Sequence, residues 1–192
     1  NVNEYKVVNF KLKTSKNYEF SNKINQEPFK LSDKNLKHTF DILTASLVKK
    51  LLSLPKQNRK VILGLSGGLD SAHALIIAHS AFMKLNLPLK DLICVIMPAK
   101  VSSEASMDHA TKLAKGLGLS PLNINIEEQV NLHLKDLDHK EKDVVYENTQ
   151  ARIRTLILMN IANKYPGFVL GTGDLSEIAL GFMTYNGDAS SM

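Results

Sequence analysis

The sequence predicts an α/β fold in which a doubly wound, mostly parallel sheet carries helices on both faces. From residue 60 onward, short apolar runs alternate with helical stretches, which is the pattern of repeated strand–helix units. Two of these runs end in glycine-rich turns that open helices, as at the ligand-binding edge of such sheets. The 192 residues, 44% of them hydrophobic, are sufficient for one substantial domain.

The first 28 residues are expected to lie outside this domain. Residues 8–13 alternate apolar and polar side chains, with Val8, Phe10 and Leu12 on one side, and predict one strand of a half-buried sheet. Residues 14–29 are polar and rich in Asn, Lys and Ser, which is typical of a linker. We therefore expect residues 1–28 to be the tail of a preceding domain plus a linker, with an isolated surface strand as the alternative. Residues 29–192 would form this α/β domain.

A helix is expected to begin after Ser32, which can cap it, and to stop before Pro55. Apolar residues recur in it at three-to-four spacing and predict packing against the core: Leu36, Phe40, Leu43, Leu47 and Leu51.

The rest of the chain predicts four strands and the helices between them. The expected strands are residues 61–63, 92–97, 122–126 and 168–170. The expected helices are residues 70–83, 103–117 and 144–164, and one that starts near Leu175. In such sheets, ligands bind beyond the carboxyl ends of the strands, where the strand order reverses.

Composition argues against several classes of partner. The net charge of +5 comes from lysines that are thinly spread, without tryptophan or interleaved aromatics, so no nucleic-acid partner is expected. No apolar run approaches a membrane span and no signal-peptide pattern opens the chain, so we expect a cytoplasmic protein. The single cysteine, Cys94, lies in an apolar run and is expected to be a buried thiol without a catalytic role.

The first glycine-rich turn is the strongest functional signal. It reads Gly64-Leu65-Ser66-Gly67-Gly68-Leu69-Asp70-Ser71. Backbone N–H groups and a helix N-terminus can hold an anion there, and the glycines allow phosphate oxygens to approach closely. We therefore expect that Gly67→Val weakens anion binding and leaves the fold largely intact. The turn lacks the Gly-Lys-Ser/Thr ending of a Walker loop. An ordinary strand-to-helix connection is the alternative, but it rarely needs two adjacent glycines flanked by serines and an acid.

The second turn, residues 171–177, brings Thr172 and Glu177 to the same rim. A carboxylate beside a polyphosphate is repulsive unless a hard cation intervenes, and Mg²⁺ accepts one or two carboxylates together with phosphates. Asp70 and Glu177 are therefore the predicted Mg²⁺ ligands. The alternative is a capping box in which Asp174 and Glu177 start a helix. Both can hold, with Asp174 as the cap and Glu177 free for metal.

A third motif lies on the helix expected at residues 144–164. Asn148 and Arg152 are four residues apart and share a helix face. An amide and a guanidinium together suit a ligand with phosphates and a polar ring substituent. Surface ion pairing is the alternative for arginines on a helix.

Taken together, these motifs resemble a known family. The string Ser66 to Ser71 resembles the pyrophosphate loop of the N-type ATP pyrophosphatases, which cleave ATP between its α and β phosphates. Combined with residues 146–154 and with residues 171–188 (GTGDLSEIALGFMTYNGD), the last two-thirds of the chain resembles NAD synthetase, in particular the synthetase domain of the glutamine-dependent form. The resemblance implies an adenine nucleotide alpha-hydrolase-like fold.

The resemblance also implies roles for individual residues. The first turn would hold the phosphates of ATP, Thr172 would contact ATP, and Asp70 and Glu177 would hold Mg²⁺. The pocket for nicotinate adenine dinucleotide (deamido-NAD) would be lined by Asn148, Arg152, Glu177 and Phe182. The reaction would adenylate the nicotinate carboxylate, release pyrophosphate, and let ammonia displace AMP to give NAD. Ammonia would come from glutamine hydrolysed in a nitrilase-like domain outside this chain.

The chain departs from the family pattern in three places. Residues 97–103 lack the usual Gly-aromatic pair, so adenine contacts there are not carried over. Tyr185 replaces a lysine of the ammonia-dependent enzymes, which favours the glutamine-dependent form. The chain stops at Met192, before the last part of the family's domain, so we expect a C-terminally truncated domain.

The family further implies a homo-oligomer, at least a dimer. Two alternatives stay open: another N-type ATP pyrophosphatase, either GMP synthetase-like or tRNA-modifying, and a non-catalytic nucleotide-binding fragment.

Overall fold

The four strands form one parallel sheet in the order β3-β2-β1-β4, as expected of a doubly wound fold. The computed structural model describes residues 7–13, 21–22, 27, 30–99 and 103–187. The strands are β1 (Lys60–Gly64), β2 (Leu92–Ile96), β3 (Leu122–Asn123) and β4 (Gly167–Val169). β1 lies at the centre, with β2 on one side and β4 on the other, so the strand order reverses between β1 and β4.

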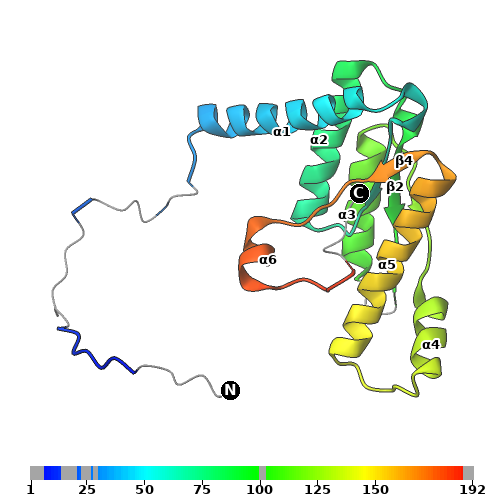
Figure 1. The fold of residues 1–192 in the computed structure, drawn as a ribbon. Helices are drawn as coiled ribbons and strands as arrows, with labels where there is room; N and C mark the ends of the chain where they lie inside the picture. The colour runs from blue at the N-terminus through cyan, green and yellow to red at the C-terminus, as the bar shows by residue number, and fades with distance from the viewer. Residues whose placement is uncertain (1–6, 14–20, 23–26, 28–29, 100–102, 188–192) are drawn as a thin grey trace.

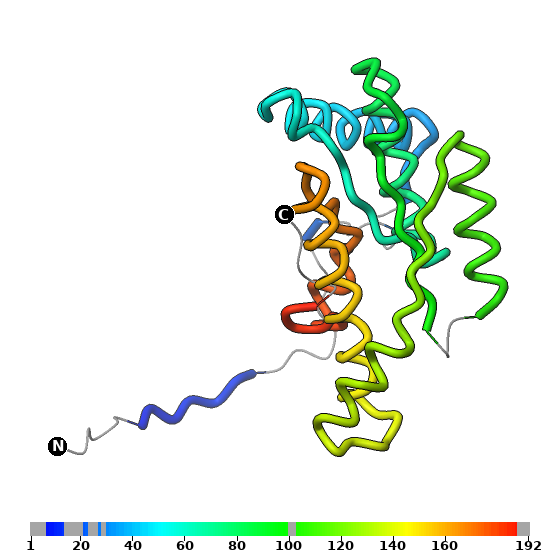
Figure 2. Tube along the Cα trace, turned by 90° about the vertical axis from the view of Figure 1, so that its right-hand side faces the viewer, coloured from blue at the N-terminus to red at the C-terminus, as the bar shows by residue number. Residues whose placement is uncertain are grey.

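Helices cover both faces of this sheet (Figures 1 and 2). One face carries α1 (Asp33–Ser53), α2 (Leu69–Leu85) and α3 (Glu104–Gly116). The other carries α4 (Glu127–Asp136) and α5 (Val144–Lys164). The remaining elements are η1 (Lys56–Asn58), η2 (Leu89–Asp91) and α6 (Leu175–Leu180).

The sequence of β1 is a continuous apolar run, and not an alternating one, because both faces of the strand are buried. Val61 and Leu63 pack with α1, α2 and α3, whereas Ile62 packs with α4 and α5. All three side chains are fully buried. A central parallel strand has both faces covered, so each residue must be apolar.

α1 begins as predicted, because the Ser32 hydroxyl accepts a hydrogen bond from the Asn35 amide at 3.4 Å. The predicted apolar stripe is wrong at Leu36, which is 52% exposed, and at Leu43, which is also exposed. Phe40 is half-buried, with its ring 6.4 Å from that of His73 in α2, and Leu47 and Leu51 are buried against the core. The first turn of α1 extends away from the body of the domain (Figure 1).

Three other expectations differ from the structure. Residues 8–13 form no strand, and Val8, Phe10 and Leu12 are at least 70% exposed. A strand needs an edge to pair with, and this segment lies away from the sheet (Figure 1). The linker expected at residues 14–29 lies almost entirely outside the described residues. β3 is shorter than predicted, and the sequence-based prediction missed α4.

Cys94 is buried, as predicted. Burial raises the pKa of its thiol to about 11. Among the described residues, no helix combines the length and apolar character needed to cross a bilayer.

A stability prediction follows from Thr44 on α1. This residue is fully buried, and its hydroxyl is the one buried side-chain polar atom in the described part of the chain without a hydrogen-bond partner. An unpaired buried hydroxyl costs free energy, so we expect Thr44→Val to raise the free energy of unfolding by about 1 kcal/mol. Urea denaturation measures it. Thr44→Ser is the control, because it keeps the hydroxyl, removes a buried methyl group, and should lower stability by about 1 kcal/mol. A destabilised valine variant would contradict this account.

Candidate nucleotide-binding site

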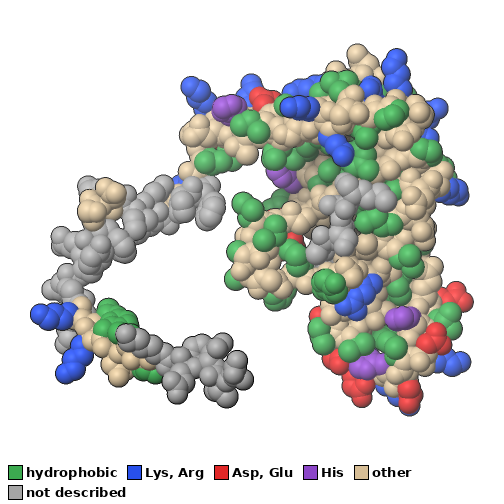
Figure 3. Space-filling view, viewed as in Figure 1, with side chains coloured by type: hydrophobic (Ala, Val, Ile, Leu, Met, Phe, Trp, Pro, Cys, Tyr) green, Lys and Arg blue, Asp and Glu red, His purple; other side chains and the backbone are tan. Residues whose placement is uncertain are grey.

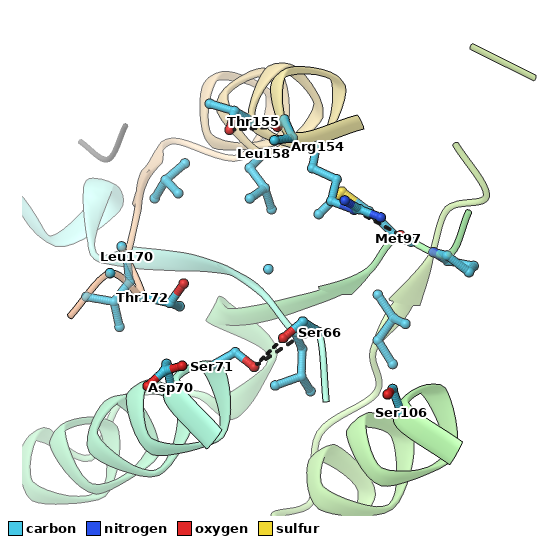
Figure 4. A pocket seen from close by; sticks show the side chains of 18 of the residues that line it. Ser66, Asp70, Ser71, Met97, Ser106, Arg154, Thr155, Leu158, Leu170 and Thr172 are labelled. Atoms are coloured by element: carbon cyan, nitrogen blue, oxygen red, sulfur yellow. Dashed lines mark hydrogen bonds between the residues drawn. The ribbon is translucent and has the colours of Figure 1, made fainter. Parts of the chain in front are cut away.

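A pocket of about 390 Å³ opens beyond the carboxyl ends of β1, β2 and β4. It therefore lies beside the point where the strand order reverses, where a doubly wound sheet binds its ligand. Its walls come from four parts of the chain (Figure 4). These are the glycine-rich turn after β1 (residues 64–71, called the phosphate-type turn from here on), the start of α3, one face of α5, and the turn after β4. The predicted ATP residues that line it are Gly64, Leu65, Ser66, Asp70, Ser71 and Thr172, and the predicted metal ligand Glu177 lines it as well.

The turn after β1 is held in shape by its own hydroxyl groups. The Ser66 and Ser71 hydroxyls are 3.1 Å apart, and the Ser66 hydroxyl accepts a hydrogen bond from the Gly68 amide at 3.2 Å. The Ser71 hydroxyl in turn donates to the Gly68 carbonyl at 3.1 Å. No side chain caps α2, whose N-cap is Gly68. The N-terminal end of α2 therefore lies at the pocket without a side-chain cap, and uncapped N–H groups of this kind can hold an anion.

Gly67 is required by packing as well as by ligand approach. Its φ of +86° is in the left-handed region. A Cβ atom there would lie 2.1 Å from the Ser106 carbonyl oxygen in α3. The expectation that Gly67→Val leaves the fold largely intact is therefore wrong, because any side chain collides with the backbone of α3. Gly67, Gly68 and the exposed Leu69 belong to the turn but do not line the pocket.

The two predicted metal ligands meet at this pocket, but Glu177 is not free. Asp174 and Glu177 form the capping box that starts α6. The Asp174 carboxylate accepts from the Glu177 amide at 2.7 Å, and Oε2 of Glu177 accepts from the Asp174 amide at 3.0 Å. The alternative interpretation of this turn, a capping box formed by Asp174 and Glu177, is therefore confirmed. Glu177 nevertheless lines the pocket together with Asp70.

The donor set suits one kind of metal. In the described part of the chain, no group of three His, Cys, Asp or Glu side chains could enclose an ion. Asp70 and Glu177 alone offer hard carboxylate oxygens. This number fits Mg²⁺, which takes one or two carboxylates and completes its shell with phosphate oxygens and water.

The residues predicted to bind deamido-NAD do not line this pocket, apart from Glu177. The side-chain amide oxygen (Oδ1) of Asn148 accepts a hydrogen bond from the Thr184 hydroxyl at 2.7 Å. Arg152 Nε donates to the Tyr185 carbonyl at 3.2 Å. Asn148 and Arg152 therefore share a face of α5, as predicted, and that face holds the segment that follows α6. Phe182, in that segment, is 82% exposed.

Hydrophobic side chains are exposed over the α6 segment (Figure 3). They belong to Leu175, Ile178, Leu180, Phe182 and Tyr185. This segment projects from the body of the domain (Figure 1). Glu177, at its start, lines the pocket.

The sequence-based prediction missed the part that α5 plays in the pocket. The residues of α5 that line it are Ala151, Arg154, Thr155 and Leu158. Their spacing is three and four residues, so they form one stripe along the helix. The motif around Arg152 obscured this signal, because Arg154 is two positions further along and points about 200° away. Ser106 and Met107, from the start of α3, also line the pocket and were not predicted.

Residues 36–192 match the family described as NAD synthase. The glutamine-dependent NAD(+) synthetase of Mycobacterium leprae is 39% identical over 159 residues, which cover 79% of this chain and 23% of that protein. The chain therefore spans about a quarter of the length of this relative.

Two solved structures share the fold. The glutamine-dependent NAD+ synthetase from Acinetobacter baumannii in complex with ADP has a TM-score of 0.68 and 33% identity, covering 80% of this chain and 29% of that one. The NMN synthetase from Francisella tularensis has a TM-score of 0.71 and 28% identity, covering 81% and 62%.

The two glycines of the turn should respond differently to alanine. We expect Gly67→Ala to lower the free energy of unfolding by about 1–3 kcal/mol, since it combines a left-handed backbone with a collision against α3. Gly68→Ala is the matched control, because its new methyl group meets only the Ser66 hydroxyl, at 3.3 Å. It should change stability by less than about 1 kcal/mol. Urea denaturation compares the two, and equal effects would rule out the α3 contact as the reason for Gly67.

Proposed function

The chain belongs to the NAD synthase family, and we propose that it carries the ATP-binding, amide-forming site of a glutamine-dependent NAD synthetase. One observation carries this proposal. The phosphate-type turn after β1 and the turn bearing Thr172 and Glu177 meet in a single pocket at the switch point of the sheet. The ADP held by the A. baumannii enzyme supports a nucleotide as the ligand of this pocket.

The first step we propose is adenylation of the acceptor. A nicotinate carboxylate oxygen of deamido-NAD attacks the α-phosphorus of ATP, the bond to the bridging oxygen of the β-phosphate breaks, and pyrophosphate leaves. The N–H groups at the start of α2 face the pyrophosphate, and the Ser66–Ser71 hydroxyl network holds the turn in one shape. Donors that are already oriented cost no reorganisation as charge develops.

The second step forms the amide. Ammonia attacks the acyl carbon of the adenylate, AMP leaves with the bonding electron pair, and loss of a proton gives the carboxamide of NAD. No protein nucleophile is required by this chemistry. Orientation of the two substrates supplies the main protein contribution.

Asp70 and Glu177 are the proposed Mg²⁺ ligands. When bound, Mg²⁺ would neutralise charge on the phosphates. The capping-box bond uses one oxygen of Glu177, so its second oxygen is the one we assign to the metal. The same capping bond fixes the position of this carboxylate at the pocket.

The acceptor site is proposed where α5 meets the segment after α6. Asn148 and Arg152 hold that segment through Thr184 and Tyr185, and Phe182 is exposed beside them. A second acceptor is nicotinate mononucleotide, which the likeness to the F. tularensis NMN synthetase favours. Both acceptors present the same carboxylate to ATP.

We further propose that two copies of the chain associate. The exposed apolar side chains of the α6 segment form the kind of surface that a protein partner covers. Because the segment adjoins the proposed acceptor site, such a contact would enclose the acceptor.

The proposed metal pair predicts a specific pattern of variants. In a mixture of Mg-ATP, deamido-NAD and ammonium, we expect NAD and AMP to form at equal rates. Asp70→Asn and Glu177→Gln should each reduce AMP formation by about a hundredfold or more. The double variant should be little worse than either single one, because the two carboxylates act as one unit. Chromatographic measurement of AMP provides the readout.

Controls separate the metal role of Glu177 from its capping role. Glutamine can keep the capping box, so Glu177→Gln isolates the charge. Asp174→Ala removes the cap, and its effect should appear in stability before it appears in Mg²⁺ dependence. Near-normal turnover of both single charge variants, or effects that simply multiply, would contradict a shared metal. Replacing deamido-NAD with nicotinate mononucleotide distinguishes the two acceptors.

Glutamine should not be hydrolysed by this chain. Burial raises the pKa of the Cys94 thiol to about 11, so below about pH 9 it stays protonated and is a poor nucleophile. We expect no glutamate release between pH 7 and pH 9, and Cys94→Ser should leave ammonium-dependent activity unchanged. A coupled glutamate dehydrogenase assay measures this. Glutamate release that Cys94→Ser abolishes would overturn the assignment.

A further inference from the structure

β2 continues past its last paired residue along the wall of the pocket. Its carbonyl groups alternate between its two neighbours, as in any strand. The Val95 carbonyl accepts from the Leu65 amide at 2.8 Å on the β1 side, and the Ile96 carbonyl accepts from the Ile124 amide at 2.9 Å on the β3 side. The Pro98 carbonyl, two residues further, accepts from the Ile126 amide at 3.0 Å, again on the β3 side.

The Met97 carbonyl breaks this ladder, because β1 has no residue left to pair with it. After Leu65 the chain leaves the sheet and turns into the phosphate-type loop. In place of a backbone amide, Arg154 Nε donates to the Met97 carbonyl at 3.3 Å (Figure 4). Arg154 reaches it from α5, across the gap that the departure of β1 leaves open. That gap is the pocket.

The two ends of the pocket differ in chemistry. One end holds the Ser66 and Ser71 hydroxyls, Asp70 and Thr172 (Figure 4). The side nearest Arg154 holds Met97 and Leu158, which are apolar and suit a flat ring (Figure 4). If the first end takes the polyphosphate, as proposed above, the second takes the base.

We propose that Arg154 is a positioning residue for the base end of the ATP site. Its guanidinium substitutes for the missing backbone donor of β1 and keeps the main chain at Met97 and Pro98 extended against the pocket. This satisfies a backbone carbonyl that would otherwise face the pocket unpaired. Among the described residues that line the pocket, Arg154 is the only cation, yet it is placed opposite the polyphosphate end. The inference rests on the proposal that the pocket binds ATP.

Binding of ATP fragments tests the proposal, with a matched pair of variants. Arg154→Lys keeps the positive charge but puts a methylene group where Nε was. Arg154→Met removes both the positive charge and the Nε donor. We expect each variant to lower the affinity for AMP and for ATP by the same factor, about tenfold, because a bond from a charged donor is lost. The affinity for inorganic pyrophosphate with Mg²⁺ should stay within about twofold. Isothermal calorimetry measures all three ligands.

Three results would overturn the positioning role. Wild-type AMP affinity in Arg154→Lys alone would show that charge matters and the Nε bond does not. A selective loss of pyrophosphate binding would make Arg154 a phosphate ligand. Unchanged affinities in both variants would remove any role. These results leave the proposed function intact, whereas a wild-type chain that binds neither ATP nor AMP would end both proposals.

A spectroscopic readout covers the case in which a variant folds poorly. With ¹³C in the methionine carbonyls of the wild-type chain, the Met97 resonance should have the downfield shift of a hydrogen-bonded carbonyl. In Arg154→Lys this resonance alone should move upfield, while the other methionine carbonyls keep their positions. A Met97 signal that does not move would show that the bond is absent in solution and overturn the proposal.

Discussion

The fold depends on the burial of β1 between two strands and two layers of helices. Its three central side chains are completely buried, and neighbouring residues belong to opposite cores. Because β1 is central and all strands are parallel, the carboxyl ends of β1, β2 and β4 meet at one edge. The turns after β1 and β4 and the start of α3 after β2 bring most of the pocket lining to this edge, and α5 adds a stripe of residues from the helix before β4. The packing of the parallel strands thereby brings the polar groups of the pocket together at one edge of the sheet.

The chain leaves the sheet after β1, which opens the pocket and leaves one carbonyl at the end of β2 without a backbone partner. The turn that follows β1 uses Ser66 and Ser71 to satisfy its own polar groups, and Gly67 lets it press against the backbone of α3. The Met97 carbonyl, just after β2, has no partner in β1 and accepts a hydrogen bond from the Arg154 side chain of α5 instead. The proposed anion site at the start of α2 and the pocket itself therefore have a common structural origin.

α5 serves two sites with two neighbouring faces. The stripe that contains Arg154 lines the pocket, whereas Asn148 and Arg152 hold the segment after α6. In the proposed function, this helix of 21 residues keeps ATP and its acceptor at a fixed separation. Such fixed placement is the main requirement of a reaction that needs no protein nucleophile.

The sequence by itself determined the fold class, the four strands and the two glycine-rich turns at the pocket, because these depend on local signals. Continuous apolar runs mark buried parallel strands, and the glycines and serines after β1 mark a turn at a helix N-terminus. The sequence also offered both roles of Glu177, and only the structure showed that its carboxylate completes the capping box.

Tertiary structure alone decided what depends on neighbours distant in the chain. The exposed Leu36 and Leu43 of α1 and the unpaired residues 8–13 follow from the absence of a surface to pack against, which periodicity does not reveal. The packing role of Gly67 is visible only once α3 lies beside it. The role of Arg154 at the pocket is visible only once the carbonyl of Met97, at the end of β2, lies within its reach. A motif fixes which chemical groups are available. Only the packing of elements fixes which of those groups face the ligand.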